Sequence, residues 1–245
     1  MKRIFDFLLI RILPNFYFSQ FLSAALLKHF KPKHYIDLWS TQPFNGQIQR
    51  ARQIRILAAE FEPSICIETG TYFGTSTPHL ASLVSGKTFT IEIDPKVFQE
   101  TKMRLSQNFP MFDITCILGD SATQLEKLLE NLDPGSEKIL AYLDAHWQDA
   151  LPLASELGAL AKWGGNWIAI VDDFMVPGDA GYGYDRYGSE AISKSQVPSD
   201  FDLEVYVPSS PSLLESGAKR GTAYIVGRNL RSQLDGNAFS ELKVI

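Results

Sequence analysis

Acidic side chains follow two of the apolar runs in this sequence, at the point where each run ends. KILAYLD ends in Asp144, and NWIAIVDD ends in Asp172 and Asp173. Neighbouring parallel strands end at the same edge of a sheet, so we expect these three carboxylates to lie together. Crowded carboxylates repel one another, and a bound cation is the simplest reason to gather them. Oxygen ligands favour Mg²⁺ or Ca²⁺ over zinc, and Mg²⁺ suits a small site completed by water.

A structural role for the second pair of acids is the alternative. Asp172 and Asp173 could cap the end of their strand, or they could form ion pairs with Arg186 or Lys219. Either arrangement would satisfy their charges without a metal ion.

A histidine stands two residues after the first of these acids, in the run DAHW. The imidazole of His146 could remove the proton from a substrate hydroxyl, because its pKa suits that work near neutral pH. A lone histidine is, however, more often a structural group whose hydrogen bonds are satisfied inside the protein. Trp147 is equally a wall of a substrate pocket or a core side chain.

The glycine-rich segment IETGTYFGTS, at 67–76, follows a strand-like run and leads into a helix-like one. Gly70 and Gly74 would let the backbone turn sharply and approach a ligand closely. Ligands of open α/β sheets bind beyond the carboxyl ends of the strands. The spacing E-x-G-x-x-x-G differs from the dinucleotide motif G-x-G-x-x-G, which argues against an NAD-dependent dehydrogenase. The alternative is that the glycines only make a tight strand-to-helix turn.

Two more polar turns follow the next two strand-like runs. TIEIDP places Glu92 where a carboxylate can accept hydrogen bonds from both hydroxyls of a ribose. Asp94, which precedes a proline, is a predicted helix cap. LGDS places Asp120 and Ser121 where an adenine amino group could be bound, and a helix cap is the competing explanation for both.

Short apolar runs alternate with helix-like segments from about residue 64, which is typical of parallel βαβ units. The predicted strands are 64–68, 88–93, 113–118, 138–144, 166–173, 202–207 and 221–227. The connection between the last two is too short for a helical crossover, so they should pair antiparallel. The predicted fold class is therefore α/β, with a doubly wound seven-stranded sheet. Residues 1–60 would form an N-terminal helical cap or oligomerisation segment, residues 61–245 the main domain, and the loop 175–188 a lid.

These motifs and their order resemble the class I S-adenosylmethionine-dependent methyltransferases over residues 60–230, and more narrowly the metal-dependent O-methyltransferases of the catechol and macrocin type. The resemblance implies a Rossmann-like methyltransferase fold with strand order 3-2-1-4-5-7-6 and an antiparallel last strand. It also implies that Asp144, Asp172 and Asp173 hold the metal. The residues implied to bind the cofactor are Glu68, Gly70, Tyr72 and Gly74 at the methionine end, Ser76 near the carboxylate, Glu92 at the ribose, and Asp120 and Ser121 at the adenine.

The function implied by the resemblance is Mg²⁺-assisted methyl transfer from S-adenosylmethionine to a hydroxyl of a small-molecule or sugar acceptor, with Asp144 and His146 as catalytic residues. Catechol-type enzymes carry a D-H-W-K run whose lysine is the base. Here Gln148 follows Trp147, so that lysine is missing and His146 becomes the candidate base. Two alternatives are a cephalosporin-hydroxylase-like relative of the same fold and a non-catalytic cofactor-binding protein.

Composition limits the other classes. A net charge of −5 argues against a nucleic-acid-binding protein. Cys66 and Cys116 lie in strands that another strand should separate, so we expect free thiols, as in the cytoplasm. The segment MKRIFDFLLIRIL is too short and too charged to span a bilayer. It predicts an amphipathic helix packed on the domain or on a second copy in a homodimer, and contact with a membrane surface is the less favoured alternative.

Overall fold

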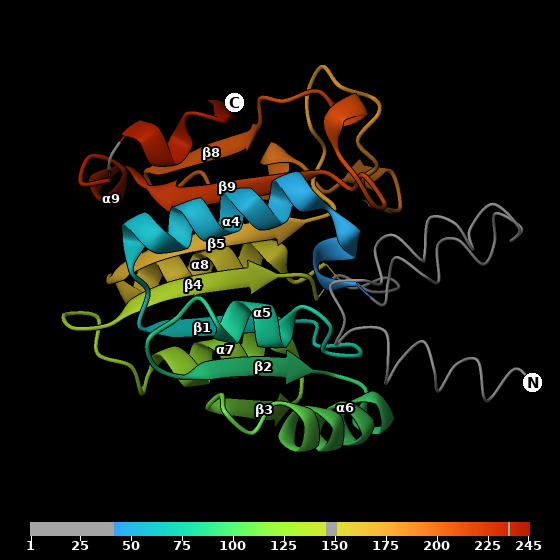
Figure 1. The fold of residues 1–245 in the computed structure, drawn as a ribbon. Coiled ribbons are helices and arrows are strands. Elements are labelled where there is room, and N and C mark those ends of the chain that lie inside the picture. Colours follow the sequence, from blue (N-terminus) through green and yellow to red (C-terminus); the bar gives the residue numbers. More distant parts are fainter. Residues whose placement is uncertain (1–41, 146–150, 235) are drawn as a thin grey trace, which may run out of the picture.

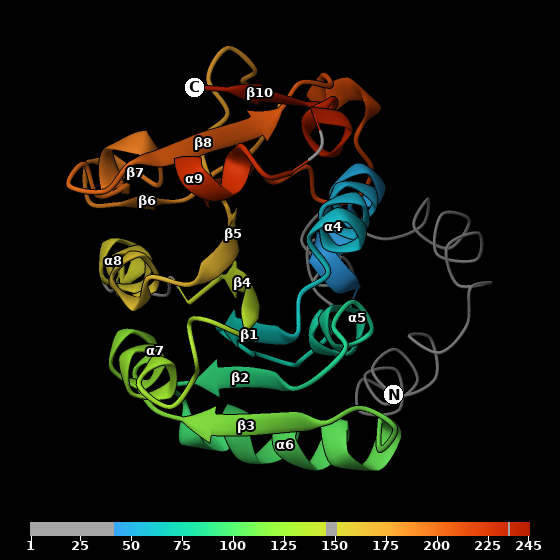
Figure 2. The ribbon, with the colours of Figure 1, turned by 90° about the vertical axis from the view of Figure 1, so that its left-hand side faces the viewer.

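The structure of the protein, a computed structural model, describes residues 42–145, 151–234 and 236–245. Within these ranges, an eight-stranded sheet runs through the middle of the molecule and helices lie on both of its faces (Figure 1, Figure 2). The strand order is β10-β8-β9-β5-β4-β1-β2-β3. Strands β3, β2, β1, β4 and β5 are parallel to one another, and β9 is antiparallel to both β5 and β8.

The strands of the main sheet are β1 (Ile65–Thr69), β2 (Thr88–Glu92), β3 (Ile114–Leu118), β4 (Lys138–Leu143), β5 (Asn166–Asp172), β8 (Leu203–Pro208), β9 (Thr222–Gly227) and β10 (Leu242–Val244). The α-helices are α4 (Ile48–Phe61), α5 (Thr77–Ala81), α6 (Pro95–Asn108), α7 (Ser121–Leu129), α8 (Leu153–Trp163) and α9 (Arg228–Arg231). Short elements are the hairpin of β6 (Arg186–Tyr187) and β7 (Glu190–Ala191), and the 3₁₀ turns η2 (Pro43–Gly46), η3 (Lys194–Gln196), η4 (Ser212–Leu214) and η5 (Gly236–Phe239).

The predicted sheet is confirmed, with one addition. The seven predicted strands are β1 to β5, β8 and β9, and they lie in the predicted order 3-2-1-4-5-7-6 with the seventh antiparallel. The prediction missed β10, which pairs antiparallel with β8 and makes the edge of the sheet. Its three residues are too few to show a strand period, and pairing with β8 holds them in place.

Two apolar layers hold the sheet between its helices. Alternate residues of each strand point to opposite faces. In β4, Ile139 and Ala141 belong to the cluster shared with α7 and α8, whereas Leu140 and Tyr142 belong to the cluster shared with α4. Figure 2 shows α7 and α8 on one face and α4 and α5 on the other. Burial on both faces explains why the central strands are continuous apolar runs in the sequence.

Helix α4 makes up the last part of the predicted N-terminal segment 1–60 and packs against the sheet. It packs Ile54, Leu57 and Phe61 into the second of these clusters. Its own N-cap residue makes no side-chain cap, and the carboxylate of Glu215 instead accepts hydrogen bonds from the backbone N–H groups of Gln49 and Arg50. In the part of the chain that the structure describes, no helix combines the length and the apolar character needed to cross a membrane.

Candidate active site

The glycine-rich turn after β1 packs directly on the end of β4. Gly70 has a φ of +79°, and a Cβ atom added to it would lie 2.2 Å from the carbonyl oxygen of Asp144. The backbone N–H of Asp144 in turn donates to the carbonyl of Thr69 at 3.0 Å. Strands β1 and β4 pair along their length, and only glycine at position 70 allows the turn after β1 to pass this close to the backbone after β4.

Glu68 lies beneath this turn and is buried. Its carboxylate accepts hydrogen bonds from the hydroxyls of Thr77 at 2.6 Å and Thr90 at 2.7 Å. Burial raises the pKa of Glu68 to about 7, although these two hydrogen bonds oppose the shift. Glu68 therefore ties the end of β1 to α5 and β2, which fixes the path of the turn above it.

Glu92 joins the turns that follow β1 and β2. One carboxylate oxygen accepts from the backbone N–H of Tyr72 at 2.8 Å, and the other accepts from the backbone N–H of Asp94 at 2.9 Å. A carboxylate oxygen can accept two hydrogen bonds, so each has capacity for a hydroxyl. Ile93 and Leu118, at the ends of β2 and β3, are 61% and 42% exposed. An acid beside an apolar surface suits a nucleoside, whose ribose is polar and whose base is flat and apolar on its faces.

Four other residues that the sequence singled out have structural roles. Asp94 caps α6, as expected, by accepting from the backbone of Lys96 at 2.8 Å. Asp120 caps α7 through one oxygen, which accepts from the backbone of Thr123 at 2.9 Å, and Ser121 is the buried first residue of that helix. Ser76 accepts from the backbone N–H of Phe44 at 3.1 Å, a contact with η2 that the sequence did not indicate.

Asp172 is surrounded by hydrogen-bond donors. Among the described residues, four donate to its carboxylate: Arg50 Nη1 at 2.5 Å and the backbone N–H of Asp173 at 2.7 Å on Oδ1, and Tyr142 Oη at 2.8 Å and Asn45 Nδ2 at 3.3 Å on Oδ2. An ionised carboxylate offers about four lone-pair positions. Burial and the negative charge of Asp172 raise the pKa of Tyr142, which keeps that phenol protonated as a donor.

Asp173 pairs with a different arginine. Arg220 donates through Nε to Asp173 and through Nη2 to Asp185, which lies in the loop after β5. The sequence-based alternative named Arg186 and Lys219 as partners. Arg186 instead donates to Tyr184 and to the carbonyl of Ser189.

The three acids do not come together as a metal-binding set. Over residues 42–145, 151–234 and 236–245, no group of three His, Cys, Asp or Glu side chains is placed to hold a metal ion. Asp172 directs its lone pairs at Arg50 and Tyr142, and Asp173 directs its carboxylate at Arg220. As arranged, Asp144, Asp172 and Asp173 do not fit a magnesium site, because two guanidinium groups already supply positive charge to the acid pair.

The loop 175–188 is attached to the body of the protein. Tyr182 is buried and donates to the carbonyl of Ser210 at 3.2 Å, so it is a core side chain. Tyr187 lies nearer the acids: burial raises its pKa, and the charges of Asp185, Asp173 and Asp144 raise it further. His146 and Trp147 lie outside the described residues.

Sequence reasoning missed Arg50 and Tyr142, although one signal was available. The buried residues of α4 recur with a helical period, and they are Arg50, Gln53, Ile54, Leu57, Ala58 and Phe61. Arg50 and Gln53 thus stand on the apolar stripe of the helix. A charged residue on such a stripe requires a buried partner, but the sequence does not show which acid supplies it.

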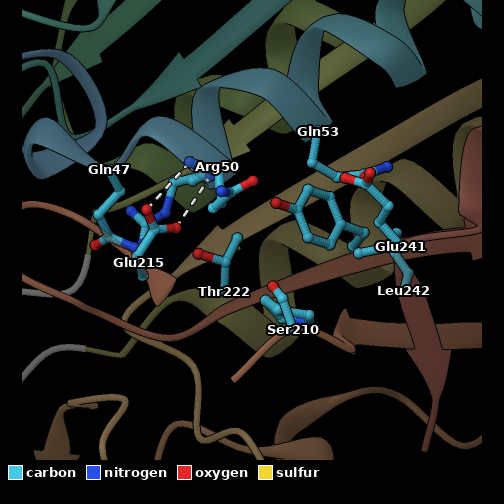
Figure 3. A pocket seen from close by; sticks show the side chains of 11 residues that line it. Gln47, Arg50, Gln53, Ser210, Glu215, Thr222, Glu241 and Leu242 are labelled. Carbon is cyan, nitrogen blue, oxygen red and sulfur yellow. Dashed lines mark hydrogen bonds between the residues drawn. The ribbon is translucent and has the colours of Figure 1, made fainter. Parts of the chain in front are cut away.

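A small cavity lies beside Arg50, between α4 and strands β8 and β9 (Figure 3). Its volume is about 20 Å³ and its lining includes Tyr224 and Thr222. Arg50 Nε and Gln53 Oε1 are buried and lack hydrogen-bond partners within the described part of the chain. None of the described residues predicted for the cofactor or the metal lines this cavity, which is large enough for a water-sized molecule only.

Two solved structures share the fold. A "putative caffeoyl-CoA O-methyltransferase" from Staphylococcus aureus superposes with a TM-score of 0.54 at 14% sequence identity, over 85% of this chain and 98% of that one. Cofactor-bound Rv0187 from MTB superposes with a TM-score of 0.50 at 18% identity, over 86% of this chain and 96% of that one. At these identities the likeness establishes the Rossmann-like methyltransferase fold and nothing finer.

Sequence comparison goes further. Catechol O-methyltransferase from Mus musculus is 29% identical over 139 residues, which are 54% of this chain and 49% of the mouse protein. The chain thus spans about half the length of this curated relative. The model of the family described as Rhamnosyl O-methyltransferase/CmcI matches residues 39–192, more than half of the chain and including β1 to β5. The chain belongs to the rhamnosyl O-methyltransferase/CmcI family.

Proposed function

We propose that the protein transfers a methyl group from S-adenosylmethionine to a hydroxyl of a small-molecule or sugar acceptor. The observation that carries this proposal is the position of Glu92, which bridges the turns after β1 and β2 at the carboxyl edge of the sheet. Family membership supports the same reaction. The sheet edge also has the two chemical surfaces that the cofactor needs: an acid for its ribose, and exposed apolar side chains for its adenine.

The cofactor-binding residues follow from this geometry. Glu92 would accept hydrogen bonds from the ribose hydroxyls, and Ile93 and Leu118 would cover the adenine. The turn that contains Gly70 and Tyr72 would face the methionine end, with Glu68 holding that turn from below. When bound, S-adenosylmethionine supplies an electrophilic methyl group on a positively charged sulfur.

The acid edge would receive the acceptor. The backbone carbonyl of Asp144 lies against the Gly70 turn. We assign the side chains of Asp144 and His146 to accept the proton of the acceptor hydroxyl. The acceptor oxygen would then bond to the methyl carbon as the sulfur–methyl bond breaks, and the electron pair of that bond would stay on sulfur. Holding the two reactants in line would supply much of the rate. No step of the proposal passes through magnesium, since the acids present do not form a site for it.

Calorimetric titration with S-adenosylmethionine tests the proposal. Glu92→Ala should weaken binding by at least about tenfold, because it removes the acceptor of the ribose hydroxyls and loosens both turns. Glu100→Ala, at an exposed position of α6, is the matched control and should bind like the wild type. A wild-type chain that binds neither S-adenosylmethionine nor its demethylated product would refute the proposal. Mass analysis of hydroxylated acceptors incubated with the chain would then identify the methylated product.

A further inference from the structure

Arg50 is an unusual residue for the inner side of a helix. It is 2% exposed and stands on the face of α4 that packs against the sheet. Burial alone would lower its pKa, but the negative charge of Asp172 outweighs that effect and raises the pKa, so the guanidinium keeps its charge. A buried charge of this kind is stable only with a close partner.

The guanidinium of Arg50 connects three separate segments. Nη1 contacts Asp172 at the end of β5, while Nη2 donates to the carbonyl oxygens of Arg220 at 2.7 Å and Gly221 at 3.3 Å, just before β9. Gln47, at the start of α4, bonds to both the N–H and the carbonyl of Arg220. Arg220 in turn holds Asp173 through its side chain. One guanidinium therefore fixes Asp172 directly and Asp173 through Arg220.

Each lone-pair position of the Asp172 carboxylate has a donor. Arg50 donates from α4, Tyr142 donates from β4, and Asn45 donates from η2. A divalent ion would have to displace at least one of these donors. Displacing Arg50 would leave a buried positive charge without its partner, which is strongly unfavourable. The ion would also have to gather acids that now face separate cations.

We propose that Arg50 is the fixed cation of the acid edge, a positioning residue that holds Asp172 where the family resemblance implies a metal ion, and that methyl transfer by this chain is independent of divalent metal. The inference rests on the proposed function. Arg50 acts through Asp172 and through the Arg220–Asp173 pair, and within the described part of the chain none of its hydrogen bonds reaches a proposed cofactor residue or the Gly70 turn. The positive charge of Arg50 belongs to the chain itself, whereas a metal ion would have to bind from solution.

Titration with Mn²⁺, followed by the electron paramagnetic resonance signal of the free ion, tests the metal part of the inference without measuring activity. The wild-type chain, with and without S-adenosylmethionine, should bind no Mn²⁺ at concentrations matched to the protein. One tightly bound Mn²⁺ per chain that Asp172→Asn abolishes would overturn the inference. The readout does not depend on finding an acceptor, so failure of the proposed function would leave this result decisive.

Variants of Arg50 test its positioning role. Arg50→Met should lower kcat by at least about tenfold, because the guanidinium fixes the end of β5 and the segment before β9, which form the acid edge proposed to receive the acceptor. The Kd for S-adenosylmethionine should stay within about twofold of wild type. Arg50→Lys keeps a charge beside Asp172 but cannot reach both segments at once, so it should recover part of the lost kcat. Arg52→Met is the matched control, because Arg52 is on the same helix in an exposed ion pair with Glu241, and it should retain wild-type kcat.

Two results would refute the inference. Equal kcat for Arg50→Met and Arg52→Met would refute a positioning role. Activity that a chelator removes and Mg²⁺ restores would refute independence from metal. If Arg50→Met does not fold, Arg50→Lys and the Mn²⁺ titration of the wild type still decide the matter.

Discussion

The carboxylate of Glu68 shows how a single residue couples the turn after β1, the proposed cofactor turn, to pH. In the folded protein its pKa is raised to about 7 from an ordinary value of 4.5, mainly by burial. Between these two values the unfolded chain releases the proton while the folded chain keeps it. The stability associated with Glu68 is therefore present below about 4.5 and is lost as the pH rises through about 7.

Glu68→Gln should remove this pH dependence, since a neutral amide has no proton to lose. Relative to the variant, the wild type should lose up to about 3 kcal/mol of unfolding free energy across this range. Urea unfolding of both proteins at several pH values measures the difference. Glu100→Gln, exposed on α6, controls for a change of charge alone. Parallel curves for wild type and Glu68→Gln would contradict the assignment.

Residues near one another in the sequence were predictable, and residues joined by the fold were not. Glu68, Gly70 and Glu92 could be singled out because each lies at, or just after, the end of a recognisable strand. The partner of Asp172 was not found, because Arg50 lies 122 positions earlier in the chain. The sequence shows that the adjacent acids Asp172 and Asp173 need a nearby positive charge. Only the packing of α4 on β5 shows that an arginine supplies it.

At the scale of elements, α4 depends on a loop far away in the sequence for its N-terminal cap. Figure 3 shows the carboxylate of Glu215 bonded to the first turn of the helix. A negative charge at this end of a helix is favourable, because unpaired N–H groups and the helix dipole meet there. This cap also anchors the loop 209–221, and through it the position of Arg220.

Glu215→Ala should lower the unfolding free energy by about 1–2 kcal/mol, because it leaves two backbone N–H groups without their acceptor. The urea midpoint of the purified variant measures the effect. Glu126→Ala, at an exposed position of α7, should change it by less than about 0.5 kcal/mol. A Glu215 variant as stable as the Glu126 variant would show that water replaces the cap.

Strands that form long apolar runs in the sequence were predicted well. Strands β1, β2, β4 and β5 were predicted because burial on both faces makes each one an apolar run, and the partly exposed edge strand β3 is also rich in apolar residues. Strand β10 and the β6–β7 hairpin were missed, because they are only two or three residues long and form through pairing alone. The loop 175–188 was expected to be a lid, yet it contributes Tyr182 to the core.

At the scale of the whole molecule, stability should fall from the centre of the sheet to its edges. Strands β1, β4 and β5 are buried almost throughout, whereas β3 and β10 are partly exposed edge strands. Edge strands have hydrogen bonds on one side only, and local opening there disrupts few contacts.

Hydrogen exchange measured by mass spectrometry should therefore be fastest, within the sheet, at β3 and β10 and slowest at β4 and β5. Bound S-adenosylmethionine should slow exchange at the end of β3 and in the turns after β1 and β2, because these lie at the proposed cofactor site. It should leave β10 unchanged, because that strand lies at the opposite edge. Equal protection of both edges by the cofactor would contradict the proposed site.

The contact between Gly70 and the carbonyl of Asp144 gives a simple means of sorting relatives of this chain. The ends of β1 and β4 touch there with room for a hydrogen atom and no more, since an added carbon would lie 2.2 Å from that oxygen. A relative with any larger residue at this position must hold the two strand ends farther apart, which would displace the proposed cofactor turn from the proposed proton acceptor Asp144. Position 70 would therefore separate, from sequence alone, relatives that keep this close contact of β1 with β4 from relatives that have lost it.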